Sequence, residues 1–190
     1  KFTLSINCRN TRQISYMTGI LSDQGCDAKA NVEGPEVDHI WYDDISDARR
    51  QISRTIGRYI SEGVKSTQIA ILSDRSRTNS CLSKGLFEIP FRLVEPNAEE
   101  LPGDGQIGYY TVQSFKGLEA EVIILIDLEN ISTAWAFSNN YVGASRARTK
   151  LTVALQAAER KPYEILAKRF GERMSGIDVS PMSFKSVSSE

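Results

Sequence analysis

The stretch IGYYTVQSFKGLEAEVIILID, residues 107–127, contains two apolar runs with a short polar turn between them. The runs Ile107–Val112 and Glu121–Asp127 predict two strands of the kind that is buried on both faces of a sheet. The turn between them holds Lys116, Gly117 and Glu119. Open α/β sheets bind ligands at polar residues that follow apolar strands, so we expect this block to carry the functional site.

The stretch NNYVGASRARTKLTVAL, residues 139–155, extends the pattern by one helix and one strand. It predicts a helix from about Asn139 to Arg148, which carries Arg146, and a strand over Lys150–Leu155. Arg146 is surrounded by the small residues Gly143, Ala144, Ser145 and Ala147. Because small side chains let a helix pack closely, we expect Arg146 to have a specific partner.

The rest of the chain alternates predicted strands with predicted helices. Strands are predicted at Phe2–Ile6, Val37–Tyr42, Gln68–Ser73 and Phe91–Val94. Helices are predicted after a cap at Asn10 or Thr11, after Ser46, over Arg77–Leu86 and over Ala157–Phe170. This alternation indicates an α/β fold, a mostly parallel sheet with helices on both faces in three layers.

Right-handed crossovers are expected to bring the loops at the strand ends to one edge of this sheet. On this hypothesis, which rests on topology alone, four polar groups converge at that edge. They are Arg9, Ser73–Asp74, the Lys116–Glu119 turn and Arg146.

We expect one domain over residues 1–170 and a mobile tail over residues 171–190, where apolar spacing is lost. Within the last predicted helix, Ile165, Leu166 and Phe170 are expected to face inward. The segment Glu95–Gly105 contains two prolines and two glycines, which is typical of a surface loop. The chain begins inside a predicted strand and shows no leader, which suggests a fragment of a longer polypeptide.

Composition excludes several classes of protein. Hydrophobic residues make up 41% and charged residues 25% of the chain, as in globular proteins. A net charge of −1 gives no global attraction to nucleic acid, so nucleic-acid binding requires a local basic patch. No apolar run approaches the roughly 20 residues that cross a bilayer, so no membrane contact is expected. The three cysteines lack paired metal-ligand spacing, which favours reduced thiols and a cytoplasmic protein.

Two arginines are candidate phosphate ligands, because the planar guanidinium bonds two oxygens at once. Arg9 follows a predicted strand and precedes a capped helix, where anions bind readily; the alternative is a solvated charge. Arg146 has the alternative role of a structural ion pair. Lys116 is expected to meet a phosphate and Glu119 to accept hydrogen bonds from a sugar, although Lys116-Gly117 is also a common turn.

The assembled pattern is more specific than these single residues. TVQSFKGLEAEVII at residues 111–124 resembles motif V of UvrD/Rep-type superfamily 1 DNA helicases. YVGASRARTKLTV at residues 141–153 is similar to their motif VI, and LSINCRNTRQI at residues 4–14 to their motif IV. The three motifs occur in the family's order. The chain therefore resembles the C-terminal, second RecA-like domain of such a helicase.

The resemblance implies roles for particular residues. The arginines of motifs IV and VI reach the γ-phosphate of ATP in that family, which implies that Arg9 and Arg146 are catalytic arginine fingers. The glutamate of motif V contacts the nucleotide ribose, which implies Glu119 with Gly117 in its turn. The positions near the DNA backbone, or linking it to the nucleotide, are Thr111, Gln113, Ser114 and Lys116.

The implied cofactors are ATP and Mg²⁺, and the implied partners are single-stranded DNA and a first RecA-like domain of the same polypeptide. The chain contains no GxxxxGK[ST] phosphate loop and no acidic Walker B motif. The Mg²⁺ ligands are therefore expected on the first domain, with no metal ligand in this chain. The resemblance thus implies a DNA-stimulated ATPase as part of a longer chain, while the fragment alone is expected to be inactive.

The sequence departs from the family pattern at three positions and in one insertion. Cys8 replaces the tyrosine that stacks on adenine, Gln113 replaces a histidine, and Ser145 replaces a threonine. Only the loop Glu95–Gly105 stands where UvrD-type proteins carry a large insertion before motif V. These departures indicate a shortened or divergent relative.

Two other functional classes remain open. A non-catalytic RecA-like module that binds a protein partner is favoured by Cys8, and a phosphate loop upstream of Lys1 would argue against it. A flavodoxin-like phosphate-binding domain is disfavoured, because no glycine-rich loop follows the first predicted strand. His39, the single histidine, is interpreted as structural. Trp135 and Phe137 are expected either to stack on single-stranded bases or to fix a loop to the core.

Overall fold

The computed structural model describes residues 10–24, 32–96 and 101–177. Within these ranges the chain forms a six-stranded sheet in the order β1-β6-β5-β2-β4-β3. Every neighbouring pair of strands is parallel. The strands are β1 (Asp38–Tyr42), β2 (Ile69–Ser73), β3 (Arg92–Val94), β4 (Gln106–Thr111), β5 (Ala120–Leu128) and β6 (Ala147–Gln156). The helices are α1 (Arg12–Leu21), α2 (Ile45–Ser61), α3 (Ala134–Ala144) and α4 (Arg160–Met174), with short 3₁₀ turns η1 (Ser66–Gln68), η2 (Arg77–Asn79) and η3 (Ala157–Glu159).

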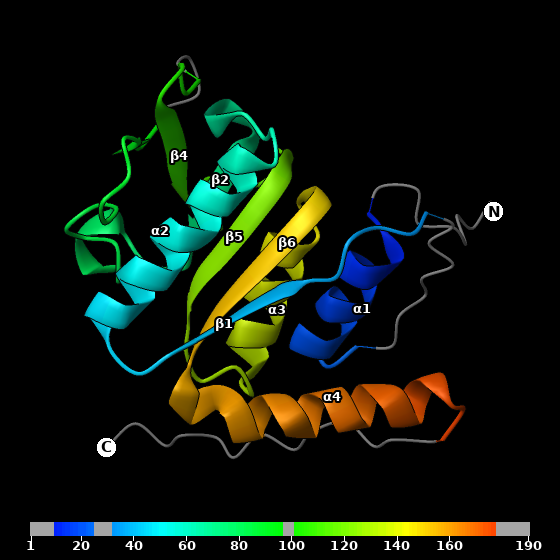
Figure 1. Cartoon of the computed structure of the whole chain (residues 1–190). Helices are drawn as coiled ribbons and strands as arrows, with labels where there is room; N and C mark the ends of the chain where they lie inside the picture. Colours follow the sequence, from blue (N-terminus) through cyan, green and yellow to red (C-terminus); the bar gives the residue numbers. More distant parts are fainter. Residues whose placement is uncertain (1–9, 25–31, 97–100, 178–190) are drawn as a thin grey trace.

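The sheet separates two apolar layers, because successive side chains of a strand point to opposite faces. Along β5, Ile123 and Leu125 join one buried cluster, whereas Ile124 joins the other. The first cluster packs under α1, α3 and α4, and the second packs under α2. Figure 1 shows α2 on one face of the sheet and α3 behind the other. The three-layer α/β arrangement expected from the sequence is confirmed.

The predicted strands within the described ranges are confirmed, with boundaries that shift by one to three residues. The predicted strand Phe2–Ile6 lies outside the described residues. Thr11 caps α1 as expected, since its hydroxyl accepts a hydrogen bond from the backbone N–H of Ile14. The cap of α2 is Asp44 rather than Ser46, because the Asp44 carboxylate accepts from the N–H of Asp47.

Three helix predictions need correction. The helix predicted over Asn139–Arg148 begins five residues earlier and ends at Ala144, because Thr133 caps its start. Only η2 and turns occupy the segment predicted as the helix Arg77–Leu86. Its serines bond nearby backbone instead: the hydroxyl of Ser80, for example, accepts from the N–H of Leu82 at 3.1 Å. Such local bonds compete with a helical ladder.

The last helix also differs from expectation. It begins at Arg160 after η3 and continues to Met174, past the expected end at Phe170. Leu166 and Phe170 are buried as predicted, but Ile165 is 53% exposed and does not face inward. Residues 178–190 of the predicted tail lie outside the described residues.

The connection between β4 and β5, residues 112–119, decides where the site residues lie; we call it the crossover. It leaves β4 at the carboxyl edge of the sheet and passes β2 to enter β5 at the amino edge. Thr111 pairs with Ser73, while Leu72 pairs with Leu125, so the crossover returns along the sheet by about six residues, or ~20 Å. Residues that are close in the sequence are therefore spread between the two edges.

Candidate functional site

The amino edge of the sheet brings together the ends of two segments. Ala120 opens β5 and pairs with Ala147, which opens β6. The backbone N–H of Ala120 also donates to the carbonyl of Arg146 at 3.2 Å. Glu119 and Arg146, which precede these two residues, therefore lie side by side in the backbone at the same edge.

Arg146 occupies a tight turn between α3 and β6 rather than the helix itself. Its N–H donates to the carbonyl of Gly143 at 3.3 Å, and that of Ser145 donates to Tyr141 at 3.1 Å. A Cβ on Gly143 would lie 2.9 Å from Cδ1 of Leu125, so a larger residue would displace this buried side chain from its place between α3 and the sheet. The close packing predicted from the small residues is confirmed.

Asn10 fixes this turn from the other end of the chain. Its side-chain amide donates to the carbonyl of Ser145 at 3.0 Å and also to the carbonyl of Ala147. Asn10 is 6% exposed; its bond to Ala147 is buried and its bond to Ser145 is partly buried. The segment that resembles motif IV thus contacts the turn that resembles motif VI. Arg9, which precedes Asn10 in the chain, lies outside the described residues, as does Cys8.

The guanidinium of Arg146 is incompletely satisfied. Its Nε is buried and has no hydrogen-bond partner among the described residues. A buried donor without a partner costs about 1–3 kcal/mol, so an acceptor beyond the described residues would stabilise this arginine.

The start of the crossover presents polar side chains near the carboxyl edge. The Thr111 hydroxyl accepts from the N–H of Ser114 at 3.1 Å and donates to the Ser114 hydroxyl at 3.0 Å. The side-chain amide of Gln113 donates to the Asn139 side chain on α3 at 3.1 Å. Gln113 and Ser114 are both exposed, so they remain accessible to a ligand.

The crossover is fixed in its middle and turns sharply before β5. Phe115 is 3% exposed and packs against Tyr110, with ring centroids 4.7 Å apart. Gly117 has φ of +94° and open space where a Cβ would stand, so its backbone angle and not its size requires glycine. Lys116, between these two residues, is exposed. The positive φ predicted for Gly117 is confirmed.

The predicted convergence at a single edge is wrong in one respect. Ser73 and Asp74 lie at the carboxyl edge, at the end of β2, whereas Glu119 and Arg146 lie at the amino edge. The reason is the crossover, which carries the chain from one edge to the other. Thr111 and Gln113 remain near the carboxyl edge, so the residues that resemble motif V occupy both edges.

A buried network at the carboxyl edge was not predicted from the sequence. Asp127 is 3% exposed and has φ of +58°. Its carboxylate accepts from the Ser73 hydroxyl at 2.6 Å and from the N–H of Cys81 at 2.9 Å. These bonds hold the segment after β2 against the sheet. An aspartate at the end of a strand is the one sequence signal for this role, and its partners depend on the tertiary structure.

The remaining candidates differ in their surroundings, and two of them, His39 and Phe137, have structural roles. His39 bonds the Tyr163 hydroxyl through Nε2 at 2.8 Å, in agreement with the interpretation made from the sequence. Phe137 is buried, whereas Trp135 is 60% exposed and does not fix a loop to the core. Arg148 lies on β6, where it forms an exposed ion pair with Glu121 at 2.9 Å.

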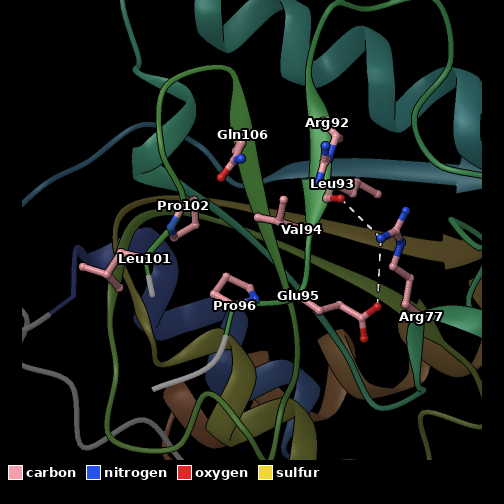
Figure 2. A pocket seen from close by; sticks show the side chains of 9 residues that line it. All are labelled: Arg77, Arg92, Leu93, Val94, Glu95, Pro96, Leu101, Pro102 and Gln106. Carbon is pink, nitrogen blue, oxygen red and sulfur yellow. Dashed lines mark hydrogen bonds and ion pairs between the residues drawn. The ribbon is translucent and has the colours of Figure 1, made fainter. Parts of the chain in front are cut away.

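A hollow of about 460 Å³ lies beside the edge strand β3, where none of the predicted site residues contributes to its walls. Figure 2 shows Arg77 there, bonded to the carbonyl of Leu93 and paired with Glu95. The described residues contain no group of three or more histidine, cysteine or acidic side chains that could hold a metal ion. Within the described ranges, no helix is both long and apolar enough to span a bilayer.

Comparison with solved structures finds a similar fold in the C-terminal domain of a possible DNA helicase from Lactobacillus plantarum WCFS1. The two share a TM-score of 0.62 and 20% sequence identity, over 78% of this chain and 87% of that one. No protein-family model and no curated protein matches the sequence. At this identity the likeness concerns the fold, and the RecA-like α/β fold expected from the sequence is confirmed.

Proposed function

We propose that this chain is the second RecA-like half of an ATP-driven motor of the UvrD/Rep-like superfamily 1 type, which moves along single-stranded DNA. The observation that carries the proposal is Arg146, whose buried Nε has no partner among the described residues. The fold likeness to the C-terminal domain of a possible DNA helicase supports it. The first RecA-like domain, expected on the same polypeptide, would supply the phosphate loop and the Mg²⁺ ligands.

In this proposal the amino edge completes the ATP site. Arg146 reaches the γ-phosphate as an arginine finger, because its charge stabilises the negative charge that spreads over the phosphoryl oxygens during transfer. Glu119 lies at the same edge and accepts hydrogen bonds from the ribose, with Gly117 supplying the turn. Asn10 fixes the backbone on both sides of Arg146, and this bonding supports a second finger at Arg9, the preceding residue.

The start of the crossover contacts the DNA strand. Hydroxyl, amide and ammonium groups on Thr111, Gln113, Ser114 and Lys116 suit phosphate and sugar oxygens. The same eight-residue crossover ends at Glu119, beside the nucleotide site. A shift of the crossover therefore moves residues at both the strand-binding site and the nucleotide site. This coupling would connect ATP hydrolysis to movement along the strand.

The first test uses the chain by itself with ATP, Mg²⁺ and single-stranded DNA. We expect background turnover, because the ligands of the metal and of the β- and γ-phosphates belong to the first domain. Turnover above background that is abolished by Arg146→Ala would show that this chain holds a complete site and would overturn the two-domain proposal.

The second test measures strand binding by fluorescence anisotropy at increasing salt. Binding should be weak, because few cations contact phosphate, and it should fall as the salt concentration rises, because those contacts are electrostatic. Lys116→Gln should weaken it further, whereas Arg148→Gln, a change of the same charge in an exposed ion pair, should have little effect. Equal effects of the two changes, or no strand binding at low salt, would favour a protein-binding module instead.

A further inference from the structure

The helix α3 exposes two aromatic rings and no charge. Trp135 is 60% exposed and Tyr141 is 46% exposed. The whole helix, AWAFSNNYVGA, contains no charged residue. Its packing against the core does not need Trp135, because Ala136 and Phe137 are buried in its place. The indole of Trp135 therefore remains available for contact with a ligand.

Trp135 lies next to the start of the crossover. Residues four apart in a helix share a side, so Trp135 is one turn from Asn139, which accepts the hydrogen bond of Gln113. Since α3 begins just after the carboxyl end of β5, this side of the helix lies near the carboxyl edge. Trp135 therefore lies one helical turn from the point where Gln113 contacts α3.

We propose that Trp135 is a stacking platform for a base of single-stranded nucleic acid. This inference rests on the proposed function, in which the start of the crossover contacts the backbone of that strand. Backbone and base then have separate partners, with polar groups of the crossover on the phosphates and the indole under a base. A single strand is required, because the bases of a duplex are already stacked on one another.

The surroundings of Trp135 favour nucleic acid over an apolar protein surface. Gln113, Ser114 and Ser138 are exposed polar side chains, and Lys116 is an exposed cation. Neither the segment 111–118 nor α3 contains an acidic residue that would repel phosphate. Stacking on an aromatic side chain is tolerant of sequence and contributes about 1–3 kcal/mol per base.

The chain allows a direct test, because it contains two tryptophans. The other, Trp41, packs between the Arg160 guanidinium, 4.6 Å from its ring centroid, and the edge of Tyr163. A Trp41→Phe chain therefore reports on Trp135 alone. Titration with oligo(dT) at low ionic strength should quench its fluorescence, whereas a duplex of equal length should quench it little.

Affinity provides the second readout, measured with a labelled oligo(dT). Trp135→Ala should raise Kd on the order of tenfold, and Trp135→Phe, which keeps a ring, should lose much less. Ile45→Ala is the matched control, since Ile45 is 58% exposed at the start of α2, on the other face of the sheet. Melting temperatures should be unchanged in all three, because the altered side chains are exposed.

The outcomes separate this inference from the proposed function. Binding that Lys116→Gln weakens but Trp135→Ala leaves unchanged would overturn stacking and leave the strand contact intact. Absent quenching with normal binding, or equal losses in the alanine and phenylalanine variants, would overturn it as well. No binding of oligo(dT) by the unaltered chain would overturn both.

Discussion

The two edges of the sheet hold charged groups in opposite situations. At the carboxyl edge, Asp127 is buried with both oxygens occupied, one by the Ser73 hydroxyl and the other by the N–H of Cys81. At the amino edge, Arg146 has a buried Nε with no partner within the described ranges. A charge whose hydrogen bonds are complete holds the fold together, whereas an incomplete one is available to a ligand.

Asp74, at the carboxyl edge, also has an unpaired polar atom, but this atom does not indicate a ligand site as the Nε of Arg146 does. Its Oδ1 is also buried and unpartnered among the described residues, but burial raises the pKa of this carboxyl above its ordinary value. A carboxyl can therefore take up a proton and lose its charge. A guanidinium does not lose its charge in this way, so a buried guanidinium N–H without a partner is satisfied only by an acceptor.

The largest expected effect is at Arg146, in the longer protein that joins this chain to a first domain. Arg146→Ala should lower kcat by a factor on the order of 10³ with a smaller change in nucleotide affinity, because the charge acts mainly in the transition state. Arg146→Lys should lower kcat nearly as much, since an ammonium does not reproduce the planar fork with which a guanidinium bonds two oxygens at once. Steady-state kinetics, nucleotide binding and melting temperature check this.

Arg148→Ala is the control for that experiment. The side chain is of the same type but lies on β6 in an exposed ion pair, which typically contributes little. Most activity should remain. Equal losses of kcat in the two variants, or a loss in the Arg146 variant that unfolding explains, would contradict the arginine-finger role of Arg146.

At the carboxyl edge the expected loss is of stability. Asp127→Ala leaves the Ser73 hydroxyl and the N–H of Cys81 without an acceptor and places alanine at φ of +58°. The free energy of unfolding should fall by about 2–4 kcal/mol in urea titrations. Asp127→Asn keeps one acceptor and tolerates this backbone angle, so its loss should be clearly smaller. A stable Asp127→Ala chain would contradict a structural role for this edge.

A third charged cluster lies between α1 and α4. Its pH dependence tests whether a charge with complete hydrogen bonds stabilises the fold. Asp23 accepts two hydrogen bonds from Arg169, at 3.0 and 3.1 Å, and pairs with Arg173 at 2.9 Å. Burial raises the pKa of Asp23, but the bonds from the two arginines outweigh it and lower the pKa below 3.8. The ion cluster therefore stabilises the fold above that pH, and the contribution is lost as the pH falls through the folded-state pKa.

Asp23→Asn should accordingly lower the free energy of unfolding by about 2 kcal/mol near neutral pH. The difference from the unaltered chain should stay constant down to the ordinary carboxyl pKa of 3.8 and shrink below it. Urea titrations across this range measure it. A difference that grows as the pH falls would have the wrong sign for this cluster.

The smallest expected effects concern two glycines with open space around them. Gly117 has φ of +94°, so Gly117→Ala should destabilise the chain by about 1–2 kcal/mol. Gly57 lies inside α2 without a positive φ, and Gly57→Ala should stabilise it by about 0.5–1 kcal/mol. Melting temperatures that move in the same direction would show that backbone angle does not govern Gly117.

The sequence alone determined the strands, the α/β class and the turn at Gly117. These features depend on short-range information, because a continuous apolar run indicates a buried strand and a glycine permits a positive φ. Helix boundaries differ more from the sequence prediction. The segment 77–86 has apolar residues at helical spacing, but its serines bond nearby backbone, and Thr133 caps α3 earlier than the apolar pattern indicates.

Only the tertiary structure decided which residues meet. Glu119 and Thr111 are eight positions apart, yet they lie at opposite edges. The reason is that β4 and β5 run parallel, so the chain leaves β4 at the carboxyl edge and must return to the amino edge to begin β5. Asn10 and Ser145 are far apart in the sequence, yet a hydrogen bond of 3.0 Å joins them. Strand order fixes such neighbours, and it results from the packing of the whole chain. The sequence therefore identified Arg146, and the fold showed that its Nε is buried without a partner among the described residues.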